Sequence, residues 1–176
     1  MELEAQDVAL RPYRVTDHDA LVAILGDAEV MKLALLERAL CLEEADQFIR
    51  ENFDTTVGGQ PKLGTLCLKP TEEVIGFAGY LPCDYLGVDG LEFGFVISRT
   101  HQCKGYATQI GRELISFALT TLGYRRLIAL CNPSNEASRN VLEKKLTMTF
   151  EKLIDVPGRG ERNVYVASRE NLHLGM

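Results

Sequence analysis

Residues 91–108 read LEFGFVISRTHQCKGYAT, a strand pattern and a helix start joined by one short loop. In the strand part, alternation places four large apolar side chains on one face and Glu92 with Gly94 on the other. A carboxylate inside an apolar strand, beside a glycine that removes side-chain bulk, predicts a cleft where a ligand approaches the backbone. The alternative is a face covered only by water, as one face of many antiparallel sheets is.

The loop that follows, residues 102–108, runs directly into the longest helical pattern of the chain, residues 105–122. Gly105 and Ala107 are small enough for successive backbone N–H groups to face one anion, and the helix N-terminus adds partial positive charge. Lys104 stands beside them. The pattern indicates a phosphate cradle, although it matches neither the P-loop nor the dinucleotide-binding fingerprint. An ordinary helix start is the alternative.

Strand and helix patterns follow one another through the rest of the chain. Apolar alternation between turn residues predicts strands at 8–14, 63–68, 74–81, 91–97, 126–131, 148–155 and 161–168. Helical spacing predicts helices at about 17–25 with Thr16 as N-cap, 27–36, 42–54, 105–122 and 134–146. The strand–helix–strand unit across 91–131 implies a parallel strand pair with a right-handed crossover, and the strands before it an antiparallel meander.

The composition is that of an ordinary globular chain, with 46 % apolar and 25 % charged residues among 176. We expect a single domain over residues 1–176. A net charge of −6 disfavours nucleic acid and anionic membranes as partners. The five cysteines and three histidines show no metal-ligand spacing, so no metal is predicted. The odd cysteine count, and a sequence without a signal-peptide or membrane-spanning pattern, predict a cytoplasmic protein with reduced thiols.

Three further segments accompany the pattern of residues 91–108. They are Leu10-Arg11-Pro12 near the start, Glu29-Val30-Met31, and the stretch NPSNEASRNVLEK at residues 132–144. Together with Glu-x-Gly-Phe and Gln-x-x-Gly-x-Ala in residues 91–108, this ordered set resembles the GNAT superfamily of N-acetyltransferases. The form of residues 132–144 is typical of the branch related to bacterial ribosomal-protein N-terminal acetyltransferases. The resemblance covers about residues 8–169, which we take as the core of the domain.

The resemblance implies an α/β (α+β) fold, with a mixed, mostly antiparallel central sheet, a parallel splayed strand pair, and helices on both faces. Acetyl-CoA, the acetyl donor, would lie in the splay, its pantetheine bonded to the backbone of Phe95, Val96 and Ile97. Its pyrophosphate would lie on the amides of Gln102, Cys103, Lys104, Gly105, Tyr106, Ala107 and Thr108. Asn135 matches the position that contacts the cofactor arm; the alternative is a polar residue in a first helical turn.

The reaction implied is attack of an amine on a thioester, which needs a base for the ammonium proton. Glu92 is the predicted base. Many family members carry a tyrosine in the helix after the fifth strand to protonate the departing thiolate, but Leu142 stands near that position here. Ser138 is the predicted substitute, with Tyr106 and Tyr124 as alternatives.

Relatives usually carry a glycine after this helix, where this chain has Lys145-Leu146-Thr147-Met148 and one apparent extra residue. If the helix ends with a left-handed residue at Thr147, the β-branched side chain is strained there.

The predicted function is acetyl transfer from acetyl-CoA to a primary amine, with the N-terminal α-amine of a protein or peptide, of the ribosomal-protein type, as the leading acceptor. The alternatives are a small amine (a polyamine, an amino acid or an aminoglycoside-like antibiotic) and a non-catalytic acyl-CoA-binding module. Residues 27–42 and 83–90 are the predicted acceptor-binding regions. A monomer and a homodimer both remain open.

Overall fold

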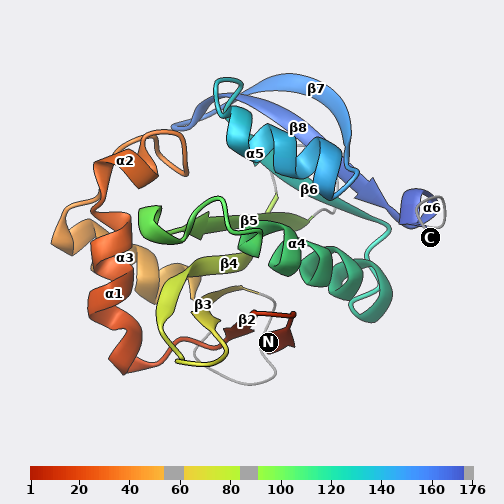
Figure 1. The fold of residues 1–176 in the computed structure, drawn as a ribbon. Helices are drawn as coiled ribbons and strands as arrows, with labels where there is room; N and C mark the ends of the chain where they lie inside the picture. The colour runs from red at the N-terminus through yellow and green to blue at the C-terminus, as the bar shows by residue number, and fades with distance from the viewer. Residues whose placement is uncertain (54–61, 84–90, 173–176) are drawn as a thin grey trace.

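The computed structural model describes residues 1–53, 62–83 and 91–172. Within them, eight strands form one sheet in the order β1-β2-β3-β4-β5-β6-β8-β7 (Figure 1). The strands are β1 (Leu3–Glu4), β2 (Val8–Arg11), β3 (Leu63–Leu68), β4 (Val74–Pro82), β5 (Leu91–Ile97), β6 (Arg126–Cys131), β7 (Thr149–Val156) and β8 (Gly160–Ser168). Only β5 and β6 pair in parallel; the other neighbours are antiparallel. The predicted mixed sheet, with its meander and its parallel pair, is confirmed.

Helices cover both faces of this sheet, as Figure 1 shows. They are α1 (His18–Leu25), α2 (Ala28–Met31), α3 (Leu42–Asn52), α4 (Tyr106–Ser116), α5 (Glu136–Asn140) and α6 (Arg169–Leu172). The apolar sides of α1, α2 and α3 pack on one face around Phe77 and Val96. The apolar side of α4, with Ile110 and Leu114, packs on the other face around Tyr80 and Phe93. None of the helices in the described ranges is long and apolar enough to cross a membrane.

Two predictions about the N-terminal region are wrong. Thr16 is not a helix N-cap, because a 3-10 turn over Val15–Asp17 precedes α1, and the Asp17 carboxylate accepts the hydrogen bond that begins this turn. The helix predicted at 27–36 is only the single turn of α2. Leu35 and Glu37 then take positive φ angles of 47° and 59°, which no helix continues through.

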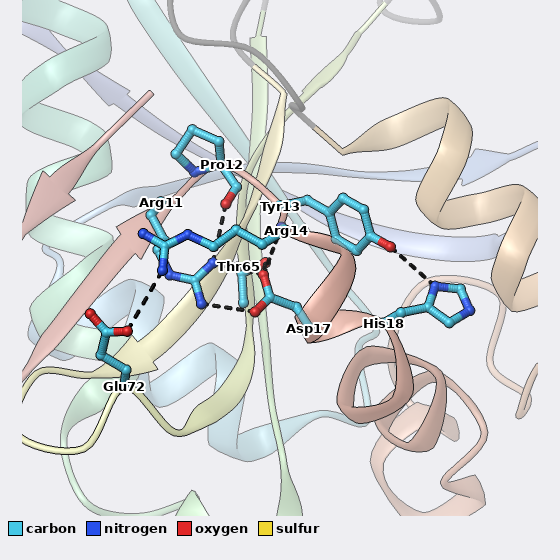
Figure 2. A network of polar contacts seen from close by, with 8 residues as sticks. All are labelled: Arg11, Pro12, Tyr13, Arg14, Asp17, His18, Thr65 and Glu72. Carbon is cyan, nitrogen blue, oxygen red and sulfur yellow. Dashed lines mark hydrogen bonds and ion pairs between the residues drawn. The ribbon is translucent and has the colours of Figure 1, made fainter.

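Asp17 is the centre of a buried polar network that joins β2, the 3-10 turn and β3 (Figure 2). Its carboxylate accepts hydrogen bonds from the Arg11 guanidinium at 2.7 and 2.8 Å, from the Arg14 backbone N–H at 2.8 Å and from the Thr65 hydroxyl at 3.0 Å. The Asp17 side chain is 2 % exposed. The network therefore fixes the start of α1 against the sheet.

The helices α4 and α5 both end in π-helical turns. α4 continues as a π-helix over Phe117–Thr121, and α5 continues over Val141–Lys145. In the second turn the Leu146 N–H donates to the Val141 carbonyl at 2.9 Å. A π turn holds one more residue than an α turn. It therefore absorbs the apparent extra residue that the sequence shows before Thr147.

Thr147 has a φ of 52°, so the condition for strain of its β-branched side chain, a left-handed residue at this position, is met. Thr147→Gly should therefore raise the free energy of unfolding by a few tenths to about 1 kcal/mol, because glycine takes this φ without strain. The gain is reduced by the loss of the Thr147 hydroxyl bond to the Leu146 carbonyl at 2.8 Å. Thr147→Ala is the matched control: it removes the hydroxyl and keeps the strain. Denaturant unfolding of the three proteins measures both effects, and a glycine variant no more stable than the alanine variant would contradict the strain argument.

Candidate active site

The parallel pair β5–β6 separates soon after it begins. Its registered pairs are Leu91 with Leu127 and Glu92 with Ile128. Beyond them, β5 stays paired with β4 along its whole length, but its other edge no longer meets β6 in the described structure. Backbone groups alternate between the two edges of a strand, so Phe95 presents its N–H and carbonyl to this edge, where they are available to an extended polar ligand. The Val96 carbonyl points to Gly76 of β4, and the Ile97 carbonyl accepts from the Gln102 side chain. This is the splay that the sequence predicts.

A cavity of about 90 Å³, partly open to solvent, occupies the splay. Five predicted site residues line it, namely Glu92, Phe95, Val96, Asn135 and Ser138. The predicted loop residues 102–108 lie outside its lining, so the structure divides the predicted site into a cavity and a separate loop beyond the end of β5.

The loop has the geometry of an open anion cradle. Gly105 takes a left-handed φ of 83° and precedes α4 without any side-chain cap, so the first amides of the helix keep their donors free of side-chain partners. Cys103 is also left-handed, with a φ of 59°. The Gln102 amide donates to the Ile97 carbonyl at 2.9 Å, which ties the loop to the end of β5. A Cβ built on Gly105 meets nothing within 4 Å, so the space above the loop is open. These features fit a pyrophosphate group at the N-terminus of α4.

Gly105→Ala should weaken acetyl-CoA binding about tenfold or more while costing only about 1 kcal/mol of stability, the usual penalty for a Cβ at positive φ. The methyl group would enter the open space where the backbone approaches the ligand. Calorimetric titration and melting curves measure the two effects separately. Gly105→Asn is the matched control for backbone strain, because asparagine tolerates the left-handed conformation. Unchanged affinity in both folded variants would remove the loop from the cofactor site.

Glu92 is 4 % exposed, so the alternative of a water-covered strand face is wrong for this side chain. Its two carboxylate oxygens accept hydrogen bonds from the two terminal nitrogens of Arg159, both at 3.0 Å. Arg159 lies in the turn between β7 and β8, where its N–H donates to the Val156 carbonyl. Sequence reasoning missed Arg159. The one available signal was its place between Gly158 and Gly160, which indicates only a tight turn.

Asn135 and Ser138, at the start of α5, also line the cavity. The Asn135 side-chain oxygen accepts from the Ser138 N–H at 3.0 Å, and its amide donates to the Leu33 carbonyl at 3.4 Å. Asn135 is thus an N-cap that also holds the segment after α2. Burial raises the pKa of the neighbouring Cys131 thiol, and a hydrogen bond with Ser138 partly offsets this.

The two tyrosines named as alternative acids lie elsewhere. Tyr106 and Tyr124 pack against the main core, and neither lines the cavity. Leu142, at the position where many relatives carry a tyrosine, is 2 % exposed and does line it. Of the three predicted acids, only Ser138 therefore faces the cavity.

Residues 33–35 close the cavity on the side of the predicted acceptor region 27–42. Arg162, 2 % exposed on β8, holds this segment by donating to the Leu35 carbonyl at 3.2 Å and pairing with Glu37 at 2.7 Å. Asn132 also donates to Glu37. The other predicted acceptor region, 83–90, lies outside the described residues except for Cys83.

The arrangement suits transfer of an acyl group. A buried carboxylate and a hydroxyl face one cavity beside an unpaired strand edge, and an anion cradle follows at the end of the same strand. The carboxylate can accept a proton and the hydroxyl can donate a hydrogen bond. These are the two proton-handling groups that attack of an amine on a thioester needs.

Comparison with known proteins agrees with this geometry. Residues 7–145 match the family described as acetyltransferase (GNAT) domain. The chain is 28 % identical over 150 residues to the uncharacterized N-acetyltransferase p20 of Bacillus licheniformis, covering 85 % of this chain and 82 % of that protein. Its fold is similar to that of an AAC(6')-Ib aminoglycoside acetyltransferase structure containing ribostamycin and coenzyme A (TM-score 0.78, 16 % identity, 97 % and 98 % of the two chains covered). It is also similar to RimL, a ribosomal L7/L12 α-N-protein acetyltransferase in complex with coenzyme A (TM-score 0.72, 14 % identity, 96 % and 98 % covered).

Proposed function

This chain belongs to the GNAT family of acetyl-CoA-dependent N-acetyltransferases, and from that premise we propose that its acceptor is the N-terminal α-amine of a protein or peptide. The fold neighbours include enzymes for two acceptor classes, a ribosomal protein N-terminus and aminoglycosides. The fold is common to both classes, so the choice between them depends on the residues of this cavity.

The observation that carries the proposal is the charge of the cavity. Its described lining contains one carboxylate, Glu92, and two guanidinium groups, Arg159 and Arg162. An aminoglycoside carries several ammonium groups and needs an excess of carboxylates around it. A peptide N-terminus brings one ammonium followed by uncharged amides. The single carboxylate of this cavity therefore suits the N-terminus better than a polycation.

The proposed donor site uses the backbone of the chain. The free edge of β5, with the backbone N–H and carbonyl of Phe95, would bond the pantetheine, and the amides from Gln102 to Thr108 would hold the pyrophosphate. The Asn135 side chain already makes two hydrogen bonds within the chain, one accepted by its oxygen and one donated by its amide nitrogen. A carbonyl oxygen has a second lone pair and an amide a second hydrogen, so a contact with the cofactor arm is still available to it.

In the proposed mechanism, acetyl-CoA supplies an acetyl group activated as a thioester. Glu92 accepts the proton that the acceptor ammonium must lose, directly or through a water molecule. The amine nitrogen would then form the new bond to the acetyl carbon while the carbon–sulfur bond breaks. The second proton that the nitrogen loses would pass to the departing thiolate, which leaves as the thiol of coenzyme A, and Ser138 would donate a hydrogen bond to the departing sulfur. Residues 33–35 and Arg159 line the same cavity and would limit the access of water to the reacting groups.

A screen of acetyl-CoA turnover with a free-thiol readout tests the proposal. The panel contains unmodified and N-terminally blocked hexapeptides, polyamines, free amino acids and aminoglycosides. We expect turnover with the unmodified peptides, none with the blocked ones, and little with the polycations. Turnover of aminoglycosides or polyamines alone would establish the small-amine alternative. Binding of acetyl-CoA without turnover of any acceptor would establish the non-catalytic alternative.

A further inference from the structure

The ion pair between Glu92 and Arg159 forms part of the lining of the cavity. Glu92 comes from the middle of the sheet on β5, and Arg159 comes from the turn at the end of the β7–β8 hairpin, 67 residues later. Both residues line the cavity, and the Glu92 side chain is 5 % and the Arg159 side chain 18 % exposed. An acceptor amine that approaches Glu92 therefore meets a carboxylate already held by a bidentate guanidinium.

An acceptor that carries only a positive charge would have to break the Glu92–Arg159 ion pair, at a net cost in binding free energy. Its ammonium would replace a two-point hydrogen-bonded partner of Glu92, and the guanidinium of Arg159 would lose a carboxylate inside a mostly buried site. An acceptor that also carries a carboxylate avoids the loss, because its own two charges can each take one member of the pair. An enzyme that matches both charges also disfavours acceptors that carry only one of them.

Of the two arginines in the lining, Arg159 has the more exposed side chain, 18 % against 3 % for Arg162. Gly158 and Gly160 flank it with φ angles of 75° and 66°, and a Cβ built on Gly158 meets nothing within 4 Å. The turn thus has room around it, and its two glycines permit backbone movement. Arg162, in contrast, is 2 % exposed and is fixed by Leu35 and Glu37.

We propose that Arg159 is a specificity-determining residue that selects an acceptor with a carboxylate close to its reactive amine. Glu92 takes the amine and Arg159 takes the carboxylate. Two kinds of acceptor carry this chemistry. One is a peptide with an acidic side chain at its second position, and for this acceptor the inference rests on the proposed function and makes it more specific. The other is a free amino acid, with its α-carboxylate.

The test compares three hexapeptides that begin Ser-Glu, Ser-Gln and Ser-Lys and are otherwise identical, together with free glutamate and serine. For the unaltered enzyme we expect kcat/KM to be at least about tenfold higher for Ser-Glu than for Ser-Gln, and lowest for Ser-Lys, as a new charge-assisted pair allows. Arg159→Gln should bring the Ser-Glu to Ser-Gln ratio close to one, and Arg159→Lys should keep a preference for Ser-Glu. Arg126→Gln removes an exposed ion pair with Glu151 outside the cavity and should leave the ratio unchanged.

Each outcome has a defined meaning. Equal kcat/KM for the three peptides in the unaltered enzyme overturns the inference without any variant, even when the peptides confirm the proposed function. A preference for Ser-Glu that survives in folded Arg159→Gln also overturns it, because the pair would then serve only to hold the hairpin. Turnover of a free amino acid but of no peptide overturns the proposed function and supports the inference, provided that Arg159→Gln abolishes the preference for that amino acid over its amide. Turnover of polyamines alone overturns both.

Discussion

Glu92→Gln should lower kcat by about 10²–10⁴-fold near neutral pH, the range expected when a general base is removed. Glutamine has nearly the same shape as glutamate, and its side-chain oxygen can still accept a hydrogen bond from Arg159, but it cannot take a proton from the acceptor. The measurement is steady-state turnover from pH 6 to about pH 10 with the best acceptor of the screen. The deficit should shrink at high pH, where more of the free amine is already deprotonated.

The affinity for acetyl-CoA gives the internal control for this variant. It should hardly change, because the proposed contacts of the donor are with the β5 backbone and the 102–108 loop. A rise in KM with kcat nearly intact would mean that Glu92 attracts the ammonium without accepting its proton. A kcat–pH profile that overlays that of the unaltered enzyme at every pH would contradict the role of base.

The fold could be predicted where local signals agree with each other. The strands at 63–68, 91–97 and 126–131 have the predicted bounds, because each is an apolar run enclosed by polar or turn residues. The helix predicted at 27–36 failed for the opposite reason. Its sequence is helical in propensity, but Leu33 and Leu35 are held through their carbonyls by Asn135 and Arg162, 102 and 127 residues away. These long-range hydrogen bonds outweigh a helix propensity of tenths of a kcal/mol per residue. No local sequence pattern predicts them.

The residues of the candidate site also fall into those that the sequence predicts and one that it does not. Glu92, Asn135 and Ser138 could be found because each lies in a short motif with fixed spacing, and all three face the cavity. Arg159 could not be found, since an arginine in a turn is usually solvated and only the folded hairpin brings it to Glu92. The sequence therefore predicts the cavity residues that lie in motifs, and the structure is needed to find Arg159.

Asp17→Asn should be the most destabilising of the substitutions considered, with a loss of about 3–5 kcal/mol at pH 7, the usual cost of breaking a buried ion pair. The carboxylate takes four hydrogen bonds while 2 % exposed (Figure 2). An asparagine would turn N–H donors toward at least one of these donors and leave the Arg11 guanidinium without its charge partner. For a chain of this length, the melting temperature should fall by on the order of 10 °C. Glu72→Gln, which removes an exposed pair with Arg14 at 3.6 Å, is the control and should shift stability by at most about 0.5 kcal/mol.

The pH dependence of this difference identifies its cause. Burial alone would raise the pKa of Asp17, but the hydrogen bonds from Arg11, the Arg14 backbone and Thr65 outweigh it, and the pKa is lowered. A carboxyl whose pKa is lower in the folded state stabilises the fold fully above its unfolded pKa of about 3.9, and this contribution is lost as the pH falls through the folded value. Urea unfolding should therefore show a constant difference between the unaltered protein and Asp17→Asn from pH 5 to about pH 8, which narrows below about pH 4. A difference that stays constant into acid would mean that packing, and not the charge of Asp17, stabilises the start of α1.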